Sequence, residues 1–123
     1  MLRTVSLRLA RTRDFPEGSA ARGYEIVAPL DDDGRLDPAT WRRHRDLCRV
    51  TRVWADEPDR RGRLVHKAGG PNGATWAIDY DARREDDDEP GFRLESHRFA
   101  EGEYVSIRNE DGDLQTFRVT RVV

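Results

Sequence analysis

The sequence is poor in cysteine and in long apolar runs, and each shortage excludes a class of protein. Its 123 residues include one cysteine, Cys48, so neither an internal disulfide nor a cysteine cluster for a metal can form. No apolar run reaches the roughly 18 residues that a membrane-spanning helix needs. Arginines interrupt the apolar residues at the start of the chain, which argues against an export signal. We therefore expect a cytoplasmic protein with no membrane partner.

Apolar residues are also few, whereas charged residues are many. Hydrophobic residues make up 36% of the chain, charged residues make up 37%, and the net charge is −2. A disordered chain combines few apolar residues with a large net charge, and the second condition fails here. The length suffices for one domain. We expect residues 1–123 to form a single folded domain with a small hydrophobic core.

Lysine is almost absent, because Lys67 is the one lysine among 22 basic residues. The chain is also rich in other residues with GC-rich codons, so the arginine bias does not by itself indicate a ligand. The charge is uneven along the chain, with a net charge of +3 over residues 1–65 and of −5 over residues 66–123. Opposite charges on the two halves would suit contact with a second copy or with a protein partner.

The sequence does contain a series of short segments in which apolar and polar residues alternate, which is the pattern of half-buried strands. Turn residues separate the segments, and Asp111-Gly112 is typical of a hairpin. We predict a mainly β protein, a small antiparallel β-barrel or sandwich of seven to eight short strands. The predicted strands are 5–9, 23–28, 49–54, 63–67, 74–80, 92–97, 103–108 and 116–122.

One short α-helix is predicted, over about residues 37–47. Asp37 can accept hydrogen bonds from the first free backbone N–H groups, and Pro38 suits the first helical position. Trp41, His44, Leu47 and Cys48 would lie near one face of this helix. Together with the inward residues of the strands, the helix predicts a core of Val5, Leu7, Leu9, Ile26, Trp41, Val53, Trp76, Ile78, Val105, Ile107, Phe117 and Val119.

A five-residue sequence, Arg-Val-Thr-Arg-Val, occurs twice, at 49–53 and at 118–122. Each copy comes after a strand-like segment and an acidic turn that ends in Asp-Gly. A duplicated pair of strands and a chance similarity both explain this repeat.

Four residues are candidate metal ligands: His66, Asp79, Glu95 and His97. Glu95 and His97 would share one face of a strand, and His66 and Asp79 would lie on neighbouring strands of one hairpin. Imidazoles and carboxylates can hold Zn²⁺ or Fe²⁺ with one position open, although the spacing matches no specific metal motif. A small metal-dependent enzyme with a divalent cation is therefore one alternative; otherwise we expect no cofactor.

Cys48 follows His44 by four residues, which places both on one helical face, and neighbouring arginines would favour a thiolate. A Cys–His nucleophile also needs an orienting group and an oxyanion site. The sequence indicates neither an orienting group nor an oxyanion site, so we expect Cys48 to be a small buried residue. No catalytic residue is assigned from the sequence.

Residues 39–63 carry eight basic and four acidic residues and include two tryptophans. Basic side chains beside aromatic rings on a small barrel can bind a single strand of nucleic acid, although the acidic second half would repel a phosphate backbone. The predicted binding residues are Arg42, Arg45, Arg49, Arg52 and Trp54.

No catalytic constellation has the required spacing, and strands with free edges can pair with a partner. We therefore expect a non-catalytic binding or accessory domain that acts through a protein partner or as a homodimer. A barrel that binds single-stranded nucleic acid and the metal-dependent enzyme are the alternatives.

Overall fold

The computed structural model describes residues 1–67, 76–80, 89–92, 94–109 and 111–123. The described residues form eight strands, one α-helix and two short 3-10 turns. The strands are β1 Leu2–Leu9, β2 Ser19–Pro29, β3 Arg49–Trp54, β4 Glu57–His66, β5 Trp76–Asp79, β6 Glu89–Phe92, β7 Tyr104–Arg108 and β8 Leu114–Val122. The helix is α1 Pro38–His44, and the 3-10 turns are Arg45–Leu47 and Leu94–Ser96.

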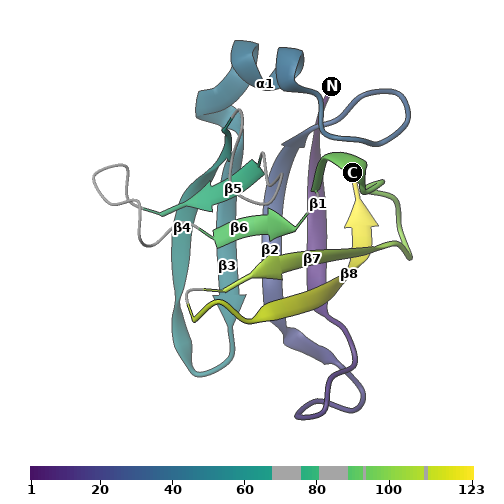
Figure 1. Ribbon diagram of the computed structural model, residues 1–123, viewed down its shortest axis with the longest axis vertical. Helices are drawn as coiled ribbons and strands as arrows, with labels where there is room; N and C mark the ends of the chain where they lie inside the picture. Colours follow the sequence, from purple (N-terminus) through teal and green to yellow (C-terminus); the bar gives the residue numbers. More distant parts are fainter. Residues whose placement is uncertain (68–75, 81–88, 93, 110) are drawn as a thin grey trace.

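Each strand pairs with the next in antiparallel orientation, and the curled sheet closes into a barrel because β8 also pairs with β1 (Figure 1). Val5 lies opposite Val122, and Leu9 lies opposite Phe117. Thr4 and Val123 exchange two backbone hydrogen bonds of 2.9 and 3.0 Å. The predicted mainly β, antiparallel fold is confirmed. The sequence suggested that strand edges could stay free to pair with a partner, but closure pairs the edges of β1 and β8 with each other.

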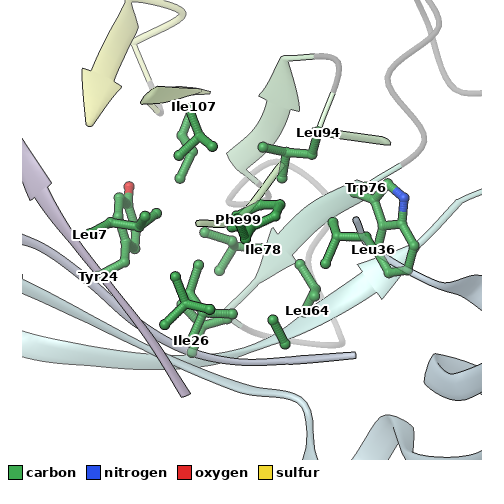
Figure 2. Close-up of a cluster of buried hydrophobic side chains, with 14 of the residues drawn as sticks. Leu7, Tyr24, Ile26, Leu36, Leu64, Trp76, Ile78, Leu94, Phe99 and Ile107 are labelled. Carbon is green, nitrogen blue, oxygen red and sulfur yellow. The ribbon is translucent and has the colours of Figure 1, made fainter. Parts of the chain in front are cut away.

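Side chains from alternate strand positions fill the interior of the barrel (Figure 2). All the predicted core residues are buried except Val53, which is half-buried. Val50 is the buried valine of β3 and lies opposite Ile26 of β2. Because successive side chains point to opposite faces of a strand, two valines three positions apart cannot both face the core. The prediction for Val53 was therefore wrong.

Loop residues complete the core in a way that strand periodicity does not show. Leu36, Leu94 and Phe99 are buried and lie outside the strands. The backbone N–H of Phe99 donates to the carbonyl of Gly34 at 2.8 Å, which ties two distant connections together. These contacts join segments far apart in sequence, so no local sequence pattern predicts them.

The predicted helix is confirmed, and α1 lies at one end of the barrel (Figure 1). Asp37 is its N-cap and accepts a hydrogen bond from the N–H of Ala39 at 3.1 Å, and Pro38 begins the helix. An isolated helix of seven residues would be unstable in water. Trp41 anchors it, because its indole Nε1 donates to the carbonyl of Leu64 at 2.7 Å.

The helix presents fewer residues to the core than expected. Trp41 and Cys48 are buried, but His44 and Leu47 are exposed. The α-helix ends at His44, and residues 45–47 form a 3-10 turn. The α-helical periodicity therefore stops before Leu47 and Cys48, and the four side chains do not lie on one helical face. No helix in the described ranges is long and apolar enough to cross a membrane.

Two sequence segments differ from expectation. Residues 56–62 were expected to form a loop, but β4 begins at Glu57, and a tight turn joins it to β3. Asp56 takes the left-handed conformation in this turn, with φ of 69°. The predicted strand 92–97 is also wrong in most of its length, because β6 ends at Phe92 and residues 94–96 form a 3-10 turn.

The predicted hairpin near the C-terminus is confirmed as β7 and β8. The two copies of the repeated sequence lie in β3 and β8, and each pairs with the strand before it, β2 or β7. The second residue of each copy, Val50 or Val119, is buried.

Candidate functional site

The five predicted binding residues lie in separate places. Arg42 and Arg45 are exposed on α1 and on the 3-10 turn that follows it. Arg49 is exposed on the outer surface of β3, whereas Arg52 and Trp54 point to the inside of the barrel. The structure therefore does not assemble these five side chains into one surface.

Arg52 and Trp54 belong to a cluster at the end of the barrel opposite α1. The Trp54 ring packs edge-on against the buried Phe117, with centroids 6.4 Å apart. The guanidinium of Arg52 lies 4.2 Å from the centroid of Trp54, and the Arg52 side chain is 11% exposed. Arg22 stacks on Phe15 at 4.3 Å beside them. Because Phe117 lies against the Trp54 ring and a guanidinium lies over it, Trp54 closes the core rather than offering a ring to a nucleic-acid base.

Three arginines on the outer surface of β3 and β4, Arg49, Arg61 and Arg63, form what we call the arginine face. Arg49 lies directly opposite Arg63, and Arg61 lies opposite Thr51. All three are exposed, and with Gly62, Asp79 and Tyr80 they line a concavity of about 420 Å³. Like charges directly opposite each other on neighbouring strands destabilise a sheet.

Two acidic residues partly balance the arginine face: Asp79 of β5, which lies opposite Arg63 and lines the same concavity, and Asp46. Asp46, in the 3-10 turn after α1, accepts a hydrogen bond from Arg63 at 3.1 Å through its carboxylate. Its backbone carbonyl accepts one from Arg49 at 3.4 Å. The guanidinium of Arg61 forms no hydrogen bond or ion pair within the described ranges. Because the ion pair of Arg63 is exposed to solvent, it contributes little to stability and can be exchanged for another carboxylate.

Sequence analysis placed Arg61 in a loop and did not join Arg63 to Arg49. The pairing of β3 with β4 brings them together. To predict the arginine face, one would need the register of the β3–β4 hairpin. The short turn after Trp54 sets this register, and the composition of the segment does not reveal it.

A second concavity, of about 700 Å³, lies where β7, β8 and β1 meet the β1–β2 connection. We call it the β8 cleft. Arg118 of β8 lies opposite Tyr104 of β7 and opposite Arg8 of β1. Sequence analysis missed this site, because only barrel closure brings β1 next to β8. The residues that line it are Arg8, Leu9, Ala10, Arg11, Glu17, Gly18, Ser19, Ala20, Tyr104, Thr116, Arg118 and Thr120.

The candidate metal ligands do not converge as far as the structure describes them. His66 lies between two tryptophans, with its ring centroid 5.9 Å from that of Trp41 and 4.6 Å from that of Trp76. Asp79 lies opposite Arg63, and Arg63 is three positions before His66 in β4. Because side chains alternate along a strand, His66 and Asp79 point to opposite faces of the sheet.

The other two candidates come from the segment after β6. His97 follows the 3-10 turn, where its N–H donates to the carbonyl of Leu94 at 3.2 Å. The side chain of Glu95 lies outside the described part of the chain. Within that part, no three His, Cys, Asp or Glu side chains are grouped closely enough to hold a metal. The four-residue metal site stays a prediction.

Cys48 is fully buried, as expected for a small core residue. Its thiol donates to the backbone carbonyl of His44 at 3.5 Å, and not to the imidazole of that residue. Burial raises the pKa of the Cys48 thiol, whereas a nucleophilic cysteine needs a lowered pKa and access to substrate. The geometry therefore favours a structural role for Cys48.

Comparison of the chain with protein-family models, with curated proteins and with solved structures yields no significant match. Function must therefore be argued from these surfaces.

Proposed function

We propose that the chain is a non-catalytic cytoplasmic binding domain that docks an acidic protein surface on its arginine face. The observation that carries this proposal is the Arg49–Arg63 pair, two like charges directly opposite each other beside the exposed Arg61. Such a pair costs stability in the free protein. Carboxylates from a partner would remove the repulsion, and the planar guanidinium fork suits them with two hydrogen bonds each.

The composition of this face favours a protein partner over a nucleic acid. The outward positions of β3 beside Arg49 are Thr51 and Val53, and the position beyond Arg63 on β4 is Val65. Small uncharged side chains among arginines suit a protein interface, where arginine is enriched. Binding to a single strand of nucleic acid needs aromatic rings for base stacking. The nearby Trp54 faces the interior, and the half-buried ring of Tyr80, which lines the concavity, already has the Arg60 guanidinium over it at 4.0 Å.

The partner could also be a second copy of the chain. Asp31, Asp32 and Asp33 form an exposed acidic turn between β2 and α1, and this turn would offer the carboxylates that the arginine face needs. If each copy used both surfaces against the same partner copy, the contact would give a closed twofold dimer; if each surface met a different copy, it would give rings or open chains of molecules.

The proposal can be tested with a short labelled poly-glutamate peptide and a labelled oligothymidylate, followed by fluorescence anisotropy at low and high salt. We expect the peptide to bind more tightly than the oligonucleotide. The double variant Arg49→Gln/Arg63→Gln should weaken peptide binding about tenfold, or roughly 1.4 kcal/mol. Sedimentation velocity of the unlabelled chain reports self-association in the same buffers.

A matched control is Arg3→Gln/Arg121→Gln, which removes two exposed arginines from β1 and β8. This control should bind the peptide as the unmodified chain does. The Arg49→Gln/Arg63→Gln variant should unfold at the same urea concentration or a higher one, because a repulsive pair is removed. An equal loss of binding in both variants, or tighter binding of the oligonucleotide, would contradict the proposal.

A further inference from the structure

Strands β7, β8 and β1 are neighbours in the barrel (Figure 1). Tyr104, Arg118 and Arg8 lie opposite one another in a row across these three strands. Their neighbours in sequence, such as Phe117 and Val119, are buried, so the three side chains point outward. Directly opposite residues on antiparallel strands have Cβ atoms about 4.5–5.5 Å apart. One ligand of ordinary size can therefore contact all three side chains.

The charges in the β8 cleft favour an anion. Arg8 forms an ion pair of 2.6 Å with Glu25, so its charge is largely balanced. Arg11 and Arg118 are exposed, and their side chains form no hydrogen bond or ion pair with the rest of the described chain. Among the described residues that line the cleft, Glu17 is the one acid. Two free guanidiniums at one cleft suit a phosphate group, which accepts paired hydrogen bonds.

Tyr104 adds a flat apolar surface beside these charges. Tyr104 is 55% exposed, and among the described residues no other Phe, Trp or Tyr is exposed to this degree. Arginine side chains lie over the half-buried rings of Phe15, Trp54 and Tyr80. An exposed ring next to a free guanidinium can hold a planar ring by stacking while the guanidinium holds the anion.

Hydroxyl groups complete the lining of the cleft. The Ser19 hydroxyl accepts a hydrogen bond from Arg22 at 3.0 Å, and the Thr120 hydroxyl donates to the carbonyl of Ser6 at 3.2 Å. The Thr116 hydroxyl lies 3.3 Å from that of Ser106. Because a hydroxyl has one donor and two acceptor sites, each of these groups retains capacity for the hydroxyls of a sugar.

We propose that the β8 cleft binds a small phosphorylated compound that carries a planar ring, of which a nucleoside monophosphate is the simplest example. Arg11 and Arg118 would hold the phosphate, and Tyr104 would stack on the ring. The cleft volume of about 700 Å³ is in the range of small-molecule sites. A single exposed ring suits one base, whereas a nucleic-acid strand needs a series of rings. This site is separate from the arginine face, so it does not depend on the function proposed above.

The probes are adenosine 5′-monophosphate, adenosine, inorganic phosphate and an oligodeoxyadenylate, each titrated calorimetrically into the full chain. We expect the monophosphate to bind more tightly than either adenosine or phosphate. Arg118→Gln should weaken binding of the monophosphate and of phosphate about tenfold. Tyr104→Ala should weaken binding of the monophosphate about tenfold and leave phosphate binding unchanged.

Arg121→Gln is the matched control, because Arg121 is exposed on the same strand and does not line the cleft. It should bind the monophosphate as the unmodified chain does, and the urea midpoint of each variant shows that it is folded. The proposal is overturned if the monophosphate does not bind, if Arg118→Gln binds it unchanged, or if oligodeoxyadenylate binds more tightly with increasing length. The last result would identify a nucleic-acid strand as the ligand.

Discussion

Strand alternation decides which arginines of this protein reach a partner. Arg49 and Arg52 are three positions apart in β3, so they point to opposite faces. Arg49 is exposed opposite Arg63, while Arg52 lies on the Trp54 ring inside the barrel. Sequence analysis joined both to one binding surface because it counted charge along the chain. Strand alternation alone would have separated Arg49 from Arg52. The contact between Arg49 and Arg63 could be found only from the pairing of β3 with β4.

At the same scale, Asp37 should make stability depend on pH. The Thr40 hydroxyl donates to its carboxylate at 2.7 Å, and this hydrogen bond is the main cause that lowers the pKa of Asp37. A carboxyl whose pKa is lower in the folded state stabilises the protein above its unfolded pKa, about 3.9, and this contribution is lost as the pH falls through the folded value.

Replacing Asp37 with alanine should therefore lower the free energy of unfolding by about 1 kcal/mol near neutral pH and by less below about pH 3. Asp37→Asn keeps a capping oxygen but cannot ionise, so its stability relative to the unmodified chain should improve on acidification. Urea unfolding at the two pH values measures both differences. A loss for Asp37→Ala that is the same at both would contradict the role of the ionised cap.

At the scale of elements, the sequence predicts strands and turns better than their connections. The helix cap, the β3 segment and the β7–β8 hairpin follow from local chemistry, because capping residues, alternation and Asp-Gly turns act over a few residues. Residues 57–62 resemble a loop because they are charged, yet they form the first half of β4. Pairing with β3 determines their conformation, and charge is tolerated there because their outward side chains lie in solvent.

The β1–β2 pair contains a position that only glycine can occupy. Gly23 lies opposite Arg8, next to a shift in register, and a Cβ there would collide with the carbonyl of Leu7. Gly23→Ala should reduce the free energy of unfolding by about 3 kcal/mol, since the backbones of two paired strands must separate.

Gly112→Ala provides the comparison for that variant. Gly112 has φ of 85° and no atom within 4 Å of an added Cβ, so only backbone strain of about 1 kcal/mol is expected. Urea unfolding of both variants compares a steric cost with a conformational one. If Gly23→Ala loses no more stability than Gly112→Ala, the strands are not packed as closely as the structure shows.

At the scale of the whole molecule, closure of the barrel by its two terminal strands determines both stability and the position of the β8 cleft. Val119 is buried opposite Leu7, and Val122 lies opposite Val5. Removing residues 119–123 would expose one side of β1 and delete a buried valine, a loss of about 2 kcal/mol for the side chain and about 1 kcal/mol for each backbone hydrogen bond.

These losses together approach the 5–15 kcal/mol that holds a domain of this kind folded. We therefore expect the shortened chain to show no cooperative transition in urea, as followed by tryptophan fluorescence. Removal of Val123 alone, which is exposed, should leave the transition cooperative. A cooperative transition in the chain that lacks all five residues would show that the barrel does not need β8 to close.

The sequence by itself determined the mainly β class, the capped helix, the C-terminal hairpin and most of the core, because alternation, capping and turn chemistry are local. Only the tertiary structure decided that β1 pairs with β8, that Arg49 meets Arg63, and that Tyr104, Arg118 and Arg8 share one surface. These contacts depend on strand register and on barrel closure. Both are determined by packing between segments far apart in the chain, and no short stretch of sequence encodes such packing.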